Sequence, residues 1–233
     1  MSSLTVVVMA YDEAENLEAV VRELHGVVAG LPGPRADELL IVDDGSRDGT
    51  GAVADRLATE LGGVRVIHHQ VNQGLGGVYR TGFREAARDL VTFFPADGQF
   101  PATIIEAFYP LMAEQDLVLG YLPRRDSSPL AKGLSAAEKV LYRLLFGPMP
   151  RYQGVFMVQR KVLQSLTLRT TGRGWGVVME MVLRIFRGPY RVTSVPTTLR
   201  PRMSGQSKVN NVRTVWINLK QAFNLRRTLR TLD

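Results

Sequence analysis

The segment Val91–Phe100 joins a short apolar stretch to two groups that could bind one divalent cation. Its sequence, VTFFPADGQF, places Asp97 and Gln99 directly after residues with high strand propensity. A carboxylate and an amide oxygen two residues apart can both face a hard cation. Taken alone, the segment is more typical of a strand followed by an Asp-Gly turn. The rest of the chain has to decide between a cation site and a turn.

Acidic residues also follow two other apolar segments. Tyr11–Glu13 follows Leu4–Ala10, and Asp43-Asp44 follows Leu39–Val42. In an open parallel sheet the carboxyl ends of the strands meet at one edge, where ligands bind. Several acidic strand ends at the same edge favour a binding site over a coincidence of turns.

The pattern of the chain predicts a sheet that would bring these segments together. Short apolar, β-branched runs alternate with stretches in which apolar residues recur at helical spacing. The expected strands are 4–10, 39–42, 64–68, 90–94 and 117–120, and the expected helices are 15–28, 52–61, one that reaches 87, and 104–112. This alternation predicts an α/β fold with a mostly parallel central sheet flanked by helices.

Beyond residue 120 the alternation is less regular. We expect helices over 134–146 and 177–186 and strands over 155–158 and 191–195. No linker divides the chain, so we expect one domain over 1–209 and a basic amphipathic C-terminal helix over 210–233. The apolar stripe of that helix consists of Val212, Val215, Trp216, Leu219, Phe223 and Leu229.

The composition excludes several classes of protein. The chain has 233 residues, 45% of them hydrophobic and 22% charged, as in an ordinary globular protein. It has no cysteine, which excludes disulfides and thiolate metal sites. His25, His68 and His69 do not have the spacing of a zinc site, so we expect them to be bystanders. We expect no signal peptide and no membrane-spanning segment.

The net charge of +7 is concentrated at the C-terminal end. Residues 200–233 contain eight Lys or Arg and one Asp, whereas the preceding residues carry 21 basic and 21 acidic side chains. A basic tail on a neutral body favours an anionic partner such as phosphate groups, lipid headgroups or nucleic acid. Nucleic acid is the weakest of these, because no recognition helix or aromatic platform motif is present.

Motifs along the chain resemble those of the family-2 glycosyltransferases with the GT-A fold, and above all the polyprenyl-phosphate hexosyltransferases. They are AYDEAENL at 10–17, VDDGSRDGT at 42–50, NQG at 72–74, ADGQF at 96–100 and RMSGQSK at 202–208. The resemblance spans about residues 4–208. It implies an inverting glycosyltransferase that uses a UDP- or GDP-linked sugar and polyprenyl (dolichyl or undecaprenyl) phosphate as acceptor.

The resemblance assigns nucleotide binding to residues that follow the first, second and fourth strands. One group would pack against the base and ribose and hydrogen-bond to them, and Asp43, with Asp44 beside it, would accept a hydrogen bond from a base N–H. The implied nucleotide-binding residues are Ala10, Tyr11, Glu13, Asp43, Asp44, Ala96 and Asp97. For Asp48 we prefer a turn-forming and helix-capping role.

The resemblance also implies Mg²⁺ or Mn²⁺ bound by Asp97 and Gln99, where it would bridge the donor diphosphate. The family motif is Asp-x-Asp, and here Pro95 replaces its first Asp. We expect the metal to be retained, because Mg²⁺ commonly uses one or two carboxylates together with substrate phosphates. Pro150 replaces a second Asp common in relatives. The two departures leave open an unusual acceptor, or a nucleotide-sugar-binding relative with weakened catalysis.

The implied phosphate- and acceptor-binding residues are Arg124, Arg202, Ser207 and Lys208. Asn72–Gly77 leads into a helix whose N-terminal N–H groups are offered to an anion. A lipid phosphate is already anionic and could attack the anomeric carbon without a base. A hydroxyl of a soluble small molecule, as in natural-product or cell-envelope biosynthesis, would need one.

Two residues are candidates for such a general base. Glu180 matches a Glu common in the family, and Asp126 is the alternative. Together with Asp97, Glu180 makes up the expected catalytic set. Glu180 is equally typical of an exposed or capping-region position on its helix.

The C-terminal helix has two interpretations. It could lie in an anionic membrane interface, or it could pack its apolar stripe on the core. The basic excess favours membrane contact through 210–230. We therefore expect a cytoplasmic protein and leave open its peripheral attachment to the cytoplasmic face of the membrane. The oligomeric state is not predicted.

Overall fold

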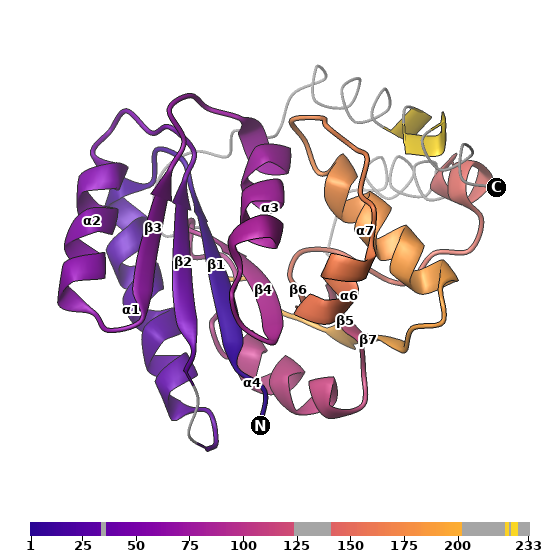
Figure 1. Cartoon of the computed structure of the whole chain (residues 1–233), viewed down its shortest axis with the longest axis horizontal. Helices are drawn as coiled ribbons and strands as arrows, with labels where there is room; N and C mark the ends of the chain where they lie inside the picture. The colour runs from indigo at the N-terminus through magenta and orange to yellow at the C-terminus, as the bar shows by residue number, and fades with distance from the viewer. Residues whose placement is uncertain (34–35, 124–140, 202–221, 224, 228–233) are drawn as a thin grey trace.

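A seven-stranded sheet forms the centre of the protein (Figure 1). This computed structural model describes residues 1–33, 36–123, 141–201, 222–223 and 225–227. The strands are β1 (Leu4–Ala10), β2 (Glu38–Asp43), β3 (Val64–His68), β4 (Leu90–Pro95), β5 (Leu117–Tyr121), β6 (Phe156–Gln159) and β7 (Val192–Pro196). Their spatial order is β3-β2-β1-β4-β6-β5-β7. The expected strands are therefore confirmed, with ends that differ by one residue at most.

The sheet is mostly parallel, as predicted. The pairs β1–β2, β1–β4, β2–β3 and β5–β7 are parallel, and the two pairs that β6 makes with β4 and β5 are antiparallel. Strand β1 lies between β2 and β4, so the connections from the first half of the sheet leave in opposite directions at this point. Such a switch point opens a crevice at the carboxyl ends of the strands. The predicted nucleotide-binding residues lie at or just after the carboxyl ends of β1, β2 and β4.

Helices cover both faces of the sheet. They are α1 (Ala14–Gly30), α2 (Thr50–Glu60), α3 (Gly74–Glu85), α4 (Ile104–Phe108), α6 (Arg160–Ser165) and α7 (Gly176–Arg187). Helices α1, α2 and α4 pack on one face, and α3, α6 and α7 pack on the other (Figure 1). The protein is thus a three-layer α/β/α arrangement.

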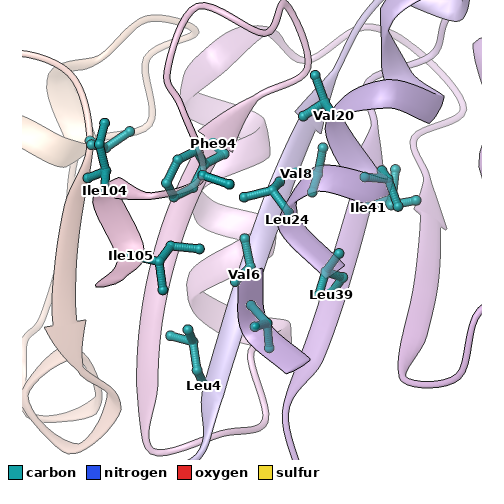
Figure 2. Close-up of a cluster of buried hydrophobic side chains, with 14 of the residues drawn as sticks. Leu4, Val6, Val8, Val20, Leu24, Leu39, Ile41, Phe94, Ile104 and Ile105 are labelled. Carbon is teal, nitrogen blue, oxygen red and sulfur yellow. The ribbon is translucent and has the colours of Figure 1, made fainter. Parts of the chain in front are cut away.

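One hydrophobic core joins β1 and β2 to α1 and α4. It includes Val6, Val8, Val20, Leu24, Leu39, Ile41, Phe94 and Ile105 (Figure 2), each at most 5% exposed. Burying an aliphatic side chain of this size contributes about 1.5–3 kcal/mol. This packing fixes the start of α1 against the end of β1, and it therefore fixes the turn Tyr11–Glu13 between them.

The expected helix over 104–112 is shorter than predicted. Helix α4 ends at Phe108, and a 3₁₀ helix, Tyr109–Ala113, follows it. The cause is Pro110, which has no N–H to continue the α-helical pattern and disfavours α geometry at the residue before it.

Two predicted helices are only partly within the described residues. Residues 141–146 are helical, and so are 222–223 and 225–227. Ala222 and Leu225 are buried against Met179 and Leu183 of α7. The remainder of 134–146 and of 210–233 lies outside the described residues, so the boundary at 209 stays a prediction. Among the described residues, no helix is both long and apolar enough to cross a bilayer.

Candidate active site

The turns that follow β1 and β2 are joined by hydrogen bonds. The N–H of Asp12 donates to Ser46 Oγ at 3.0 Å, and the N–H of Arg47 donates to Asp12 Oδ1 at 2.9 Å. The N–H of Glu13 donates to Thr50 Oγ1 at 2.9 Å. Asp12 has a φ of 50°, which Asp and Asn tolerate better than other side chains. The motifs at 10–17 and 42–50 therefore form one connected surface.

Asp48 caps two helices in this surface, as predicted. Its Oδ1 accepts hydrogen bonds from the N–H and hydroxyl of Thr50, and its Oδ2 accepts one from the N–H of Ala14 at 3.1 Å. Burial alone would raise the pKa of Asp48, but these hydrogen bonds outweigh it and hold the pKa below its ordinary value. The ionised carboxylate also suits the N-terminal ends of α1 and α2.

Asp43 is a buried carboxylate at the end of β2. Its side chain is 7% exposed, and its Oδ1 accepts the N–H of Ser46 at 3.0 Å. Its Oδ2 lies 2.9 Å from Nδ1 of His68. His68 was expected to be a bystander, so this partner is a correction.

Both carboxylate oxygens of Asp44 have hydrogen-bond partners within the protein. Its carboxylate accepts hydrogen bonds from the N–H groups of Gln73 and Gly74 at 2.8 Å, and from the Asn72 amide at 2.9 Å. It also lies 2.6 Å from Nδ1 of His69. The Asp44 carboxylate thereby caps the N-terminal end of α3 and ties the end of β2 to the end of β3. The arrangement favours a positioning role for Asp44 over the predicted contact with a base, and it gives His69, which was also expected to be a bystander, a structural partner.

The glycine-rich start of α3 is covered by the segment that precedes α7. The N–H of Gly76 donates to the carbonyl of Arg173 at 2.8 Å. The guanidinium of Arg173 donates to the carbonyl of Asn72 at 2.8 Å and to its side-chain oxygen at 2.5 Å. A Cβ on Gly76 would lie 2.6 Å from the carbonyl oxygen of Gly174, so the glycine permits this close approach.

The prediction that Asn72–Gly77 offers free N–H groups to an anion is therefore wrong for three of its residues. Gln73 and Gly74 donate to Asp44, and Gly76 donates to Arg173. The anion at this helix N-terminus is a carboxylate of the protein.

Glu180 is buried inside α7 and is 0% exposed. Its carboxylate accepts hydrogen bonds from the N–H groups of Arg169 and Thr170 at 3.1 and 2.8 Å, and from the Arg184 guanidinium at 2.7 Å. Burial would raise the pKa of Glu180, but hydrogen bonds from Thr170, Arg169 and Arg184 outweigh it and lower the pKa. A buried, fully paired carboxylate suits a role in positioning the 169–170 segment better than the predicted role of general base.

Asp97 lies in the turn after β4, at the carboxyl edge of the parallel strands. The N–H of Ala96 donates to the carbonyl of Met9 at 2.9 Å, and Gly98 has a φ of 71°. Asp97 Oδ1 accepts the N–H of Gln99 at 3.0 Å. This turn is held to the end of β1, which brings Asp97 to the same edge as Tyr11 and Asp43.

The turn is also tied to the segment that leads into the motif at 202–208. The carbonyl of Gln99 accepts the N–H of Arg200 at 2.8 Å, and the Arg200 guanidinium lies 3.0 Å from Glu23. Arg124, Arg202, Ser207, Lys208 and the alternative base Asp126 lie outside the described residues, so their roles stay predictions.

The donor set at this turn would need further ligands, such as diphosphate oxygens, to bind a divalent ion. Asp97 and Gln99 are half-buried and contribute one carboxylate and one amide. Among the described residues, no group of three His, Cys, Asp or Glu side chains could hold an ion alone. Mg²⁺ commonly takes its remaining ligands from water and substrate phosphates.

The other predicted nucleotide-binding residues lie at the same edge. Ala10 and Ala96 are 2% and 1% exposed, so their side chains have almost no surface to offer a ligand. The carbonyl of Ala10 accepts the N–H of Asp44 at 2.9 Å. Tyr11 and Glu13 are half-buried in the turn after β1.

Comparisons with known proteins identify the family of the chain. The pattern described as "Glycosyl transferase family 2" matches residues 5–167. The chain is 30% identical to the undecaprenyl-phosphate mannosyltransferase of Micrococcus luteus, with 90% of this chain and 88% of that protein covered. It is 30% identical to the polyprenol monophosphomannose synthase of Mycolicibacterium smegmatis, with 88% and 80% covered.

Solved structures show the same fold. The structure of glucosyl-3-phosphoglycerate synthase from Mycobacterium tuberculosis in complex with UDP gives a TM-score of 0.71 at 18% identity, covering 97% of this chain and 80% of that one. The structure of mannosyl-3-phosphoglycerate synthase from Rubrobacter xylanophilus gives a TM-score of 0.69 at 18% identity, covering 98% of this chain and 75% of that one. These likenesses confirm the predicted GT-A-like arrangement. Since the family match covers more than half of the chain and includes the turns after β1, β2 and β4, the chain belongs to glycosyl transferase family 2 and is a glycosyltransferase.

Proposed function

We propose that this glycosyltransferase moves a hexosyl group from a UDP- or GDP-linked sugar to a polyprenyl phosphate, with inversion at the anomeric carbon. The observation that carries the proposal is the meeting of Tyr11, Asp43 and Asp97 at one edge of the sheet, beside the switch point between β1 and β4. The mannosyltransferase relatives named above support the polyprenyl phosphate acceptor.

The nucleoside would lie across the ends of β1 and β2. Tyr11 can cover a flat base, and Asp43 can accept a hydrogen bond from its N–H. Asp44 and Asp48 do not contact the donor in this proposal, because their oxygens hold the turns and helix ends in place. The diphosphate would then extend toward Asp97 and Gln99.

Asp97 and Gln99 would hold Mg²⁺ or Mn²⁺ together with the diphosphate, and the ion would supply charge neutralisation for the departing nucleotide. The structure of glucosyl-3-phosphoglycerate synthase crystallised with Mn²⁺ and UDP-glucose supports the use of a divalent ion in this fold. Arg202 and Lys208 are proposed to contact phosphate oxygens, as the motif resemblance implies.

The acceptor chemistry agrees with the burial of Glu180. An oxygen of the lipid phosphate forms a bond to the anomeric carbon as the bond from that carbon to the diphosphate breaks, and the electron pair leaves with the nucleotide. The attacking oxygen is already anionic, so no proton has to be removed. The reaction therefore does not need Glu180 as a general base, and its burial and its pairing with Arg184 are compatible with catalysis.

A lipid acceptor requires contact with a membrane surface. Leu144 and Phe223 are 72% and 52% exposed. Arg143 directly precedes Leu144, and Arg226 and Arg227 follow Phe223 within about one helical turn. Arg226 donates to the carbonyl of Leu144 at 3.4 Å, so the two helical segments adjoin. Apolar side chains beside arginines suit an anionic lipid interface. We propose peripheral contact at the cytoplasmic face through this surface and residues 210–230.

A transfer assay tests the proposal. The protein is incubated with Mn²⁺, radiolabelled UDP-glucose or GDP-mannose, and vesicles that contain undecaprenyl phosphate. We expect label in the lipid phase with one donor, and none when Asp97→Ala replaces the wild type. A parallel incubation replaces the vesicles by soluble hydroxyl acceptors, and label transferred only there would support the small-molecule alternative. Nucleotide binding without any product would support the weakened relative.

A further inference from the structure

His68 lies between two carboxylates at the edge where the donor is proposed to bind. Its Nδ1 is 2.9 Å from Asp43 Oδ2, and its Nε2 is 3.0 Å from Asp55 Oδ1. The Asp43 side chain is 7% exposed and that of Asp55 is 67% exposed. The imidazole thus connects a buried carboxylate of β2 to an exposed carboxylate of α2.

The geometry suits a charged ring. An imidazolium donates from both nitrogens, whereas a neutral imidazole donates from only one. Hydrogen bonds to Asp43 and then Asp55 raise the pKa of His68 above its ordinary value, against a smaller opposing effect of burial. These two aspartates are the titratable groups that face the ring, one from β2 and one from α2.

His68 and the backbone together fix the Asp43 carboxylate. One oxygen accepts the N–H of Ser46 at 3.0 Å, and the other faces the ring. Each carboxylate oxygen can accept more than one hydrogen bond, so both contacts leave capacity for a base N–H. Without the ring, Oδ2 would lose its partner and the carboxylate could rotate about its own side-chain bonds.

The first turn of α2 leaves space for this pair. A Cβ on Gly51 would lie 3.1 Å from Asp43 Oδ2 and 3.4 Å from Cε1 of His68. The first distance is shorter than most contacts of a Cβ, whereas the second is an ordinary van der Waals contact, so an alanine here would press mainly on the Asp43 carboxylate. Gly51 therefore offers a second way to disturb the orientation of Asp43, one that keeps both partners.

We propose that His68 is a positioning residue for recognition of the donor's base, because it fixes the Asp43 carboxylate while Asp55 holds the other side of the ring. This inference rests on the proposed function, since it needs Asp43 to face the base. Uracil N3–H and guanine N1–H can donate to a carboxylate, whereas cytosine N3 and adenine N1 present a lone pair. A fixed acceptor discriminates strongly between these two kinds of base.

The test compares base preference across variants by calorimetric titration of UDP, CDP, GDP and ADP with Mn²⁺. We expect the wild type to bind UDP or GDP about tenfold or more tightly than CDP and ADP. His68→Ala and Gly51→Ala should each reduce this ratio to about threefold or less, because the carboxylate is no longer fixed. His25→Ala is the matched control, since His25 contacts the carbonyl of Gly62 just before β3 begins, at the opposite end of the strand.

The outcomes separate this inference from the proposed function. A wild type that binds no nucleoside diphosphate overturns both. A wild type with the expected preference that His68→Ala and Gly51→Ala retain overturns the role of His68 alone. A loss of preference in His25→Ala as well also overturns it, because the effect would then not be specific to the pair.

A second measurement needs no nucleotide. The titration of His68 by NMR should have its midpoint above that of a free histidine, and Asp55→Asn should lower the midpoint because one of the two carboxylates is gone. A midpoint at the ordinary value that Asp55→Asn leaves unchanged would overturn the proposed pairing. Circular dichroism of each variant establishes that the fold is retained.

Discussion

Replacing Glu180 by glutamine distinguishes a structural carboxylate from a catalytic base. Glu180 is 0% exposed, and its oxygens accept hydrogen bonds from Arg184 and from the N–H groups of Arg169 and Thr170. The amide removes the charge that Arg184 faces and turns one acceptor into a donor. The variant therefore leaves buried donors without a proper partner.

The expected cost follows from these contacts. Removing one partner of a buried ion pair costs about 3–5 kcal/mol, and each buried donor left without an acceptor costs about 1–3 kcal/mol. Glutamine keeps one oxygen, so we expect a loss of about 3 kcal/mol in the free energy of unfolding. For a chain of this size that corresponds to a fall of roughly 6–12 °C in Tm.

Thermal unfolding and steady-state kinetics decide the question together. Glu106 is exposed on α4, and Glu106→Gln should change the stability by less than about 0.5 kcal/mol. A Glu180→Gln variant with an unchanged Tm and a kcat lower by about a hundredfold or more would refute the structural role and support a general base.

The pH dependence of the stability provides a second test of the role of the Glu180 charge. The pKa of Glu180 is lowered by folding from its ordinary value of 4.5. The stability that its charge contributes is therefore complete above that value and is lost as the pH falls through the lower, folded-state pKa. The difference in Tm between wild type and Glu180→Gln should be full near neutral pH and should shrink below about pH 4.5.

Three further predictions concern residues in or near the proposed site. Gly76→Ala should cost about 1–3 kcal/mol in urea unfolding, because its Cβ would lie 2.6 Å from the carbonyl oxygen of Gly174. Gly26→Ala on α1, where a Cβ meets nothing within 4 Å, should stabilise the protein by about 1 kcal/mol, and equal effects of the two changes would contradict the packing described. Asp44→Asn should destabilise by about 2–4 kcal/mol, since the carboxylate caps α3; unchanged stability in a denaturant titration would oppose that role. Pro95→Asp should lower the Mn²⁺ concentration for half-maximal nucleotide binding by about tenfold, because it adds a carboxylate to the ion, and no change would count against an ion at this turn.

The sheet could be predicted from the sequence because its strands are short, apolar and β-branched. Leu4–Ala10 is buried along nearly its whole length, so it appears as a continuous hydrophobic run. The acidic residues at the strand ends then predicted a site at one edge. The early end of α4 also had a signal in the sequence, because Pro110 has no N–H and interrupts the helical hydrogen-bond pattern.

The partners of the charged residues could not be predicted in the same way. His68 and His69 contact Asp43 and Asp44, which precede them by 25 residues, and this pairing depends on the register between β2 and β3. The sequence pattern does not specify which aspartate is saturated by the protein. The burial of Glu180 did have a local signal, because Arg184 follows it at the i, i+4 spacing of a helical ion pair.

The glycines at the start of α3 show a second feature that could not be predicted from the sequence. A glycine-rich turn before a helix is typical of an anion site, and here the same residues accommodate the backbone of the segment around Arg173. Local sequence cannot distinguish a ligand from a packed loop, because both need a surface without side chains. Only the position of a segment about 100 residues further along the chain decides it.

The central claim is that one edge of the sheet holds a nucleoside diphosphate through residues that follow β1, β2 and β4. Calorimetric titration of UDP and GDP in the presence of Mn²⁺ tests it most directly, with the wild type, Asp43→Ala and Asp97→Ala measured side by side. We predict that one nucleotide binds the wild type and that each substitution weakens binding by about tenfold or more. Binding that neither substitution changes would contradict the claim.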